Sequence, residues 1–527
     1  MNGLGAALRG LRPARPARPG VRYAVCAAIG LALATLSLRF PSTPTYDPWS
    51  WIIWGREIIH LHLVTTGGPT WKPLPVLFTT ALAPFGEDAP QLWLVVARTG
   101  GITALALAFT LAFRLARTLP RRDSTEAASP ARPGRLRSPA LPGVIAGLAA
   151  AFGLIALSHY VKFVALGDSE GLLAAATLLA ILRHLDGARR QALFWWFVAS
   201  LDRPEAWPFF GIYAIYLWRH DPRARKWTAG LSAAILPLWF VPELLGSGSL
   251  VRGVQTAEHP RPESATFARC PFCTEITQHA WQLVATPFRL GALALLGIVV
   301  VRLVRRAWPA RGRRIAALRA APTHWDRVVL GVGGLGLAWF LEEAILTQAG
   351  FSGNDRYLIA AAAVVIVLGA VAWAGALSWL GARVIGLGGR TAGVLAAFAL
   401  LAPGALLVAR PRGAAGLLSV RPTENALRYQ ADLTWDLPRA VQLAGGASAL
   451  IACGPVATNP SEAPLTAWTL GLGLDSIAGA RGDVIVQTRQ AANAPLLPVL
   501  PRRPRYWLAA QVGKVSIFMH CTHRFVA

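Results

Sequence analysis

Charged residues are scarce in this 527-residue chain, and the acidic ones are the scarcer kind. Asp, Glu, Lys and Arg together make up 15% of the sequence, whereas hydrophobic residues make up 54%. Soluble domains carry about 25% charged residues, so the composition excludes a soluble multidomain protein. It is typical of a polytopic membrane protein.

Acidic residues number 26 against 52 basic ones, which gives a net charge of +26. In a soluble protein this excess would favour nucleic acid as a partner, because binding releases condensed counterions. In a membrane protein the basic residues instead retain loops on the cytoplasmic side. We therefore expect membrane lipid around the chain and no nucleic-acid partner.

The sequence lacks a small-residue cleavage site after its basic start. Arginines between 9 and 22 lead directly into the apolar segment 23–38, a pattern typical of an uncleaved signal anchor. We expect residues 1–22 to stay in the cytoplasm and the protein to lie in a bacterial plasma membrane.

Cysteine is rare as well. Cys26 lies in the first apolar segment, and the other four fall in segments that we place outside the cell membrane: Cys270, Cys273, Cys453 and Cys521. An even number of cysteines in an oxidising compartment predicts disulfides, which we expect between the first two and between the last two. A metal or redox role for the first pair is the alternative.

About eleven apolar runs can cross the roughly 30 Å hydrocarbon core of a bilayer. Longer runs lie at 23–39, 92–113, 140–158, 169–185, 228–246, 284–304, 328–347, 357–380 and 391–409, and shorter ones at 191–201 and 206–218 form a hairpin. More than half of the basic residues fall in loops on the N-terminal side, and an odd number of spans puts the C-terminus outside. The predicted fold is an all-α membrane bundle over residues 23–410.

Residues 411–527 differ in character from the bundle. They have mixed polarity, many Gly and Pro, and strand-like runs at Ser448–Ala452, Val484–Gln487 and Val515–Met519. We predict a small extracytoplasmic α+β domain here. The loop 119–139, rich in Arg, Pro and Ser, is predicted to be a cytoplasmic linker.

The remaining ionisable residues gather in four loops that this topology puts on the extracytoplasmic face. The first loop, about 40–90, also contains an amphipathic stretch at 52–63. Charge at the membrane rim is costly and usually functional, so the four loops indicate one polar cavity that opens outward. Its candidate residues are Asp47, Lys72, Asp168, Glu170, Arg203, Glu205, Arg356 and Tyr357.

Each candidate also has a purely structural interpretation. Asp47 and Asp168 could each cap the helix that follows it. Arg203 with Glu205, or Asp355 with its neighbour in sequence, could form an ion pair that only fastens a loop.

Two further groups in the first loop have ordinary interpretations. His60 and His62 are predicted to form no joint metal site, because residues two apart on a helix face different sides. The tryptophans at 49, 51, 54 and 71 fit an interfacial belt or, alternatively, the lining of a sugar or lipid groove.

The order of these residues resembles the GT-C glycosyltransferases, and in particular the protein O-mannosyltransferase and lipid A aminoarabinose transferase branch. The resemblance covers roughly residues 20–410. It rests on Asp47 early in the first external loop, Lys72-Pro73-Leu74 near the end of that loop, Arg98 in the second span, Asp168 before the fourth, and Arg356-Tyr357-Leu358 late in the membrane region.

The resemblance implies a membrane glycosyltransferase with a polyprenyl-phosphate sugar donor and an extracytoplasmic acceptor, which could be a glycan, a lipid or a protein. The matching positions are Asp47 for the catalytic aspartate, Asp168 for the second acidic residue, Lys72 beside the donor phosphate and Arg356 for the late arginine. Pro48 stands where the family has another acid, which Glu170 or Glu205 could supply.

These residue types suit inverting sugar transfer. A carboxylate, here Asp47, takes the acceptor proton as general base, and Lys and Arg side chains stabilise charge on the leaving phosphate. The sequence also allows a divalent cation to bind at Asp47, Asp168 or Glu170. The rival classes are a transporter or flippase, which favours midplane charges and internal repeats, and a non-catalytic GT-C-like accessory protein.

The topology can be tested by cysteine accessibility labelling of intact cells. Because basic residues alternate between loops, a membrane-impermeant reagent should reach single cysteines placed in 247–283 and 411–527 but not in 119–139. Labelling of 119–139 from outside would overturn the predicted threading.

Overall fold

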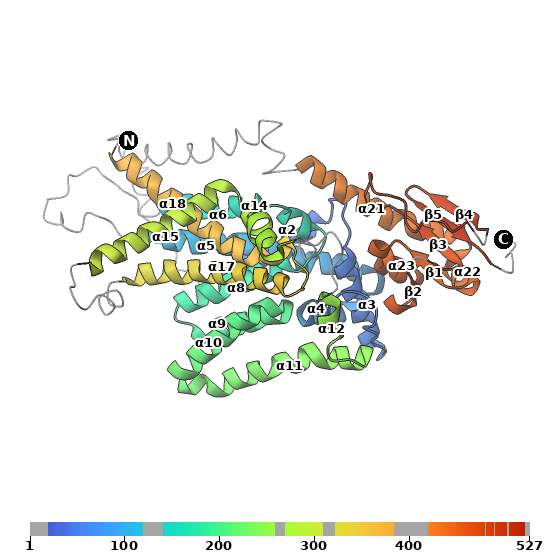
Figure 1. Cartoon of the computed structure of the whole chain (residues 1–527), viewed down its shortest axis with the longest axis horizontal. Coiled ribbons are helices and arrows are strands. Elements are labelled where there is room, and N and C mark those ends of the chain that lie inside the picture. Colours follow the sequence, from blue (N-terminus) through green and yellow to red (C-terminus); the bar gives the residue numbers. More distant parts are fainter. Residues whose placement is uncertain are drawn as a thin grey trace, which may run out of the picture.

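The computed structural model describes residues 19–119, 141–258, 269–308, 322–383 and 420–521, apart from 480, 490, 503 and 504. These residues form a helical bundle with a small sheet domain at one end of the long axis of the molecule (Figure 1).

The bundle consists of helices whose ends lie close to the predicted spans. They are α2 (Pro19–Ser37), α5 (Ala89–Arg117), α6 (Leu141–Ile155), α8 (Glu170–Leu185), α9 (Arg189–Asp202), α10 (Trp207–His220), α11 (Arg225–Ser247), α15 (Thr286–Ala307), α17 (His324–Gln348) and α18 (Ile359–Arg383). Helix α18 packs against α5, α6, α15 and α17. Its run Ala360–Ala363 is fully buried, since small side chains let neighbouring helices approach closely.

Each predicted span before residue 391 coincides with one of these helices, and the span at 391–409 lies outside the described residues. Within the described residues, five helical segments are long and apolar enough to cross a membrane: Pro73–Arg117, Pro222–Ser247, Thr286–Ala307, His324–Gln348 and Asp355–Leu380. The helical membrane bundle is therefore confirmed in outline, and the count of about eleven spans stays a prediction.

Shorter helical elements connect the bundle helices. They are α3 (Tyr46–Ile59), α4 (Pro73–Leu82), η1 (Ala83–Asp88), α7 (Tyr160–Ala165), η3 (Pro204–Ala206), η4 (Pro222–Ala224), α12 (Arg252–Ala257), α13 (Pro271–Thr274), η6 (Glu275–Ala280), α14 (Trp281–Leu283) and η7 (Asp355–Leu358). Helix α3 begins and ends earlier than the amphipathic stretch expected at 52–63.

Helix α3 is buried on most sides, so the interfacial-belt interpretation of its tryptophans is wrong. Trp49, Trp51, Trp54 and Trp71 are each at most 5% exposed. Their rings pack against Trp468, Trp93 and each other, with ring centroids 5.5 to 5.8 Å apart. Other protein elements, rather than lipid headgroups, cover this apolar surface.

Residues 420–521 form an α+β unit. Its helices are α21 (Val420–Leu443), α22 (Gly446–Cys453) and α23 (Ala463–Leu470), with short turns η8 (Pro460–Glu462) and η9 (Leu474–Ser476). Its strands are β1 (Val456–Thr458), β2 (Ile477–Ala478), β3 (Val484–Gln487), β4 (Trp507–Val512) and β5 (Val515–Met519), in the order β2-β1-β3-β5-β4. Strand β1 pairs in parallel with β2 and β3, and the β3–β5 and β5–β4 pairs are antiparallel.

Two of the three predicted strands are present with the expected bounds. The third, Ser448–Ala452, is wrong because this segment is part of helix α22. A short apolar run fits either a buried strand or one face of a helix, and here the positive φ of Gly445 and Gly454 at the two ends delimits a helix. The domain boundary at 410/411 falls outside the described residues.

The sheet domain lies against helix α3, as Figure 1 shows beside the bundle. Helix α23 packs on α3, and Arg56 on α3 donates from Nη2 to the carbonyl oxygen of Leu472 at 2.6 Å. The guanidinium also lies 5.0 Å from the ring centroid of Trp468. Helix α3 therefore connects the bundle to the C-terminal domain.

The packing of α3 on α4 depends on a glycine. A Cβ atom on Gly55 would come within 2.5 to 2.8 Å of the backbone of Thr79 and Thr80. Gly55→Ala should lower the free energy of unfolding by about 1–3 kcal/mol, because overpacking forces the helices apart. Thermal unfolding in detergent would measure the loss. Gly211→Ala in helix α10 is the matched control, since its added methyl group meets nothing within 4 Å.

Candidate active site

The guanidinium of Arg356 joins three of the predicted site residues. Its Nη2 donates to Asp47 Oδ2 at 2.6 Å, and its Nη1 donates to Asp168 Oδ1 at 3.2 Å. Its Nε lies 3.8 Å from Glu170 Oε1. Residues from the first loop, the second loop and the late Arg-Tyr motif therefore meet at one point.

Local structure places each of these carboxylates without using it as a helix cap. Asp47 lies in the first turn of α3, whose N-cap is Thr45, and Asp168 precedes Ser169, the N-cap of α8; neither N-cap residue forms a side-chain capping bond. Thr45 Oγ1 donates instead to Asp168 Oδ1 at 3.3 Å. The cap interpretation of both aspartates is wrong, since their carboxylates face Arg356.

A second cation, Arg203, extends the cluster. It connects α9 to η3, and its Nη2 donates to Glu170 Oε1 while its Nη1 lies 3.5 Å from Glu205 Oε1. Its guanidinium also lies 4.0 Å from the ring centroid of Tyr357. The ion pair with Glu205 exists, but Arg203 reaches beyond its own hairpin and belongs to the cluster.

The suggested pair of Asp355 with Arg356 does not form. Asp355 Oδ2 lies 3.3 Å from His159 Nδ1, while Arg356 turns to the aspartates. Arg98, the second-span arginine of the resemblance, holds the bundle instead: it donates to Ser37 Oγ at 2.9 Å and to the carbonyl oxygen of Ala165 at 2.7 Å.

Lys72 is the least satisfied cation of the cluster. It precedes helix α4, is 8% exposed, and its Nζ lies 5.1 Å from the ring centroid of Trp51. Among the described residues, no hydrogen-bond acceptor lies within reach of this ammonium group. A buried ammonium without an acceptor is costly, so Lys72 is prepared for an anion.

The electrostatic surroundings shift the pKa values of Asp47 and Asp168 in opposite directions. Burial alone would raise the pKa of Asp47, but the charges of Arg356 and Lys72 outweigh it and hold that pKa below its usual value. Burial and the nearby Glu170 carboxylate raise the pKa of Asp168 to about 7. Burial lowers the pKa of Lys72.

The donor set does not fit a divalent cation. Asp47 and Asp168 both direct an oxygen at Arg356, and the described residues contain no group of three or more His, Cys, Asp or Glu side chains arranged to hold a metal ion. A guanidinium occupies the position that a metal would need.

Sequence reasoning missed three members of the site. Asp202 is fully buried at the end of α9, within electrostatic reach of Lys72, and Thr45 and Trp51 contact Asp168 and Lys72. The Asp-Arg pair in the hairpin was the available signal for Asp202. Thr45 and Trp51 have uncharged side chains, so a search for clustered ionisable residues does not find them.

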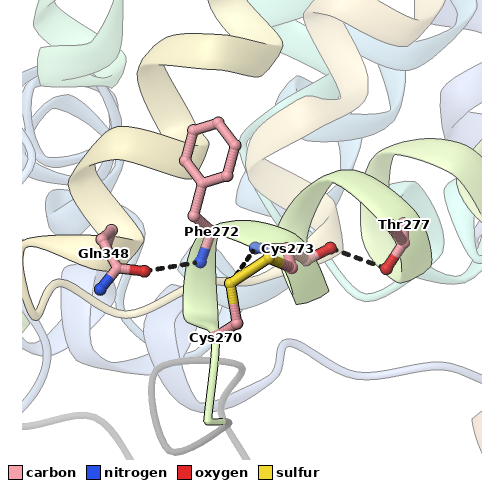
Figure 2. The surroundings of a disulfide bond; sticks show 5 residues. All are labelled: Cys270, Phe272, Cys273, Thr277 and Gln348. Carbon is pink, nitrogen blue, oxygen red and sulfur yellow. Dashed lines mark hydrogen bonds between the residues drawn. A yellow bond between two sulfur atoms is a disulfide. The ribbon is translucent and has the colours of Figure 1, made fainter.

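The four cysteines outside the first apolar segment form the expected pairs. Cys453 is bonded to Cys521, which joins α22 to the second residue after β5, and Cys270 is bonded to Cys273. Figure 2 shows the second bond at the start of α13, where the backbone N of Phe272 donates to Gln348 Oε1 at the end of α17 at 3.2 Å. The disulfide closes this turn, and the hydrogen bond of Phe272 links the turn to α17.

The charge pairing around Arg356 can be tested by stability. Arg356→Gln leaves buried carboxylates without their cation, which should cost about 3–5 kcal/mol of unfolding free energy. Adding Asp47→Asn to that variant should restore part of the loss, because it removes one of the unpaired charges. Unfolding in detergent measures both changes.

The matched control is Arg428→Gln, which removes an arginine from an exposed pair with Glu424 at 2.8 Å and should cost about 0–1 kcal/mol. Equal losses in the Arg356 and Arg428 variants would contradict the buried pairing.

Comparison with known proteins identifies solved structures with a similar fold. No protein-family model matches the sequence, and no curated protein sequence matches it. The apo structure of ArnT from Cupriavidus metallidurans is similar over 95% of this chain and 98% of its own, with 13% identity and a TM-score of 0.50. The structure of the same protein bound to undecaprenyl phosphate has the same identity and coverage and a TM-score of 0.44.

A third similar structure is the Archaeoglobus fulgidus oligosaccharyltransferase tethered to an acceptor peptide. It is 14% identical over 78% of this chain and 56% of its own, with a TM-score of 0.36. At such identities the similarity concerns the fold alone, and the evidence for it is the apo ArnT structure. The chain has the fold of the apo ArnT structure, which agrees with the resemblance of its sequence to the GT-C glycosyltransferases.

Proposed function

We propose that this chain is an integral membrane glycosyltransferase that moves a sugar from a polyprenyl-phosphate donor to an extracytoplasmic acceptor with inversion. The observation that carries the proposal is the meeting of Asp47, Asp168 and Arg356, with hydrogen bonds of 2.6 and 3.2 Å between segments far apart in sequence. ArnT, which has the same fold, is known bound to undecaprenyl phosphate, the class of lipid proposed here.

Lys72 and Arg356 bind the donor phosphate. The buried ammonium of Lys72 lacks an acceptor among the described residues, and a phosphate oxygen would supply one. The guanidinium of Arg356 is 18% exposed and can turn from a carboxylate to a phosphate, which it binds through parallel N–H donors. Both cations then stabilise the negative charge that grows on the leaving phosphate.

Phosphate binding activates Asp47. When Arg356 pairs with the phosphate, Asp47 loses its 2.6 Å partner in a buried site, and its pKa rises toward the range of an effective base. Asp47 then takes the proton of the acceptor hydroxyl as the oxygen attacks the anomeric carbon. The bond from that carbon to the phosphate oxygen breaks, and polyprenyl phosphate leaves with the electron pair.

The other members position these groups. Asp168 orients the acceptor, while Glu170 holds Arg203, whose guanidinium stacks on Tyr357. Glu205 lies on the far side of Arg203, 3.5 Å from its Nη1. These contacts fix the side chains that frame the sugar, and preorganised geometry is a large part of such catalysis.

The test measures sugar transfer by the purified protein from polyprenyl phosphate carrying a radiolabelled hexose or pentose. The acceptor is the envelope fraction of a strain that lacks the gene. Asp47→Asn keeps the side-chain size and removes the base, so turnover should fall by roughly 10²- to 10⁴-fold. Lys72→Ala should raise KM for the donor and lower kcat, because a point charge on phosphate acts in binding and in the transition state.

Glu424→Gln in helix α21 removes an exposed carboxylate and is the control, with turnover expected at the wild-type level. A folded Asp47→Asn protein with normal turnover would reject Asp47 as the base. A wild-type protein that transfers no sugar from any such donor would favour an accessory protein, and movement of the intact lipid across the bilayer would favour a flippase.

The pH profile distinguishes the two aspartates. The value of kcat/KM reports groups of the free enzyme, in which the pKa of Asp47 is lowered and that of Asp168 is about 7. A base must be deprotonated to act. With Asp47 as base, kcat/KM should not decline as pH falls from 8 to about 5; a decline below about pH 7 would assign the base to Asp168.

A further inference from the structure

A cavity of about 340 Å³ lies between the C-terminal end of α3 and the loop that follows α23. Its lining includes Arg56, Glu57, His60, His62, Asp475 and Ser476, and we call it the seam pocket. Its volume lies at the lower end of the range for small-molecule sites, which often form where two domains meet. The proposed reaction leaves this pocket without a role.

The two histidines reach the seam pocket together because the helix ends before them. Helix α3 ends at Ile59, and Leu61 adopts a left-handed conformation with φ of 56° and a 95% exposed side chain. The turn therefore brings His60 and His62 to one cavity, which a continuous helix would not do. Left-handed φ in a residue other than glycine is uncommon and clusters at functional sites.

The pocket is preformed by contacts among its lining residues, among them His60 Nδ1, which lies 2.7 Å from the carbonyl oxygen of Arg56. Arg56 is fixed by the Leu472 carbonyl oxygen and the Trp468 ring. Glu57 is 7% exposed, and its Oε2 accepts a hydrogen bond from the backbone N of Val64 at 3.0 Å. Burial, with the like charge of Asp475, raises the pKa of Glu57 to about 7, so near neutral pH this carboxyl group can donate or accept.

The arrangement suits a molecule with several separated hydroxyl groups. The described residues, those of this pocket included, contain no group of three or more His, Cys, Asp or Glu side chains placed to share one metal ion. The carboxylates, imidazoles and hydroxyl group instead stand around the cavity, where they can each meet a different hydroxyl. A sugar ring presents such a set, since every hydroxyl both donates and accepts.

The pocket and the reacting carboxylate share one rigid element. Asp47 and Glu57 lie ten positions apart on α3, which corresponds to about 15 Å along a helix axis. An acceptor longer than one sugar could therefore place its hydroxyl at Asp47 while a distant unit lies in the seam pocket. Binding energy from such a remote unit helps to orient the reacting group.

We propose that the seam pocket is an acceptor subsite that binds a polyhydroxylated sugar unit of a glycan, away from the hydroxyl that reacts. The inference rests on the proposed function and identifies the acceptor as a glycan. Each hydrogen bond to a charged side chain contributes roughly a factor of ten or more to binding.

The experiment uses the full-length protein, the labelled polyprenyl-phosphate donor and the glycan fraction of the envelope from the strain that lacks the gene. Asp475→Asn and His62→Ala change exposed side chains, so folding should be retained. Each should raise the apparent KM for the glycan by about tenfold and leave kcat and the KM for the donor unchanged. Leu61→Gly, which accepts the same φ, should keep the wild-type KM.

A second measurement obstructs the pocket. Ser476→Cys carrying a bulky maleimide should show the same rise in KM, whereas Ser448→Cys, exposed on α22 and equally labelled, should not. Unchanged KM values in all pocket variants, with transfer intact, would reject the subsite and leave the proposed function standing. Failure of the wild type to transfer any sugar would reject both.

Two other results would also reject the subsite. Label recovered only on protein would make the acceptor a polypeptide. Stoichiometric binding of Zn²⁺ or Mn²⁺ that is lost in a His60→Ala/His62→Ala variant would make the pocket a metal site.

Discussion

The guanidinium of Arg356 lies between two carboxylates that are 309 and 188 residues away in sequence. Removing these charges from water is costly, and only close, well-oriented pairing offsets that cost. This pairing therefore narrowly restricts the relative positions of three segments: the start of α3, the loop before α8 and the turn η7. The surrounding helices are packed accordingly, with α18 buried among four neighbours and the tryptophans of α3 sealed on both sides.

Helix α3 transmits this constraint to the C-terminal domain. Its first turn carries Asp47, and its last turn carries Arg56 and Glu57, which contact or face the loop after α23. Close approach to α4 at Gly55 fixes the helix from the other side. Residues 420–521 therefore pack directly on the helix that carries the proposed base.

The sequence was informative where charge and hydropathy carry the signal. Hydrophobic length predicted the bundle helices, and the placement of basic residues brought Asp47, Asp168 and Arg356 to one face. It failed where a tertiary contact decides. The tryptophans of α3 looked interfacial because nothing local indicates that Trp468 of the C-terminal domain and Trp93 of α5 cover them. The shared pocket of His60 and His62 was missed because helical periodicity does not indicate the left-handed turn at Leu61.

The charge balance of the empty site explains how donor binding and proton transfer can be linked. Lys72, Arg203 and Arg356 face at least as many carboxylates, so an entering phosphate must compete with an existing partner of Arg356. Like charges that crowd a buried site favour proton uptake by the carboxyl group that is easiest to protonate. That group is Asp168, whose pKa of about 7 already reflects its carboxylate neighbour. Protonated Asp168 can donate to the donor or the acceptor while ionised Asp47 keeps the role of base, so two aspartates on one arginine take different tasks once the phosphate binds.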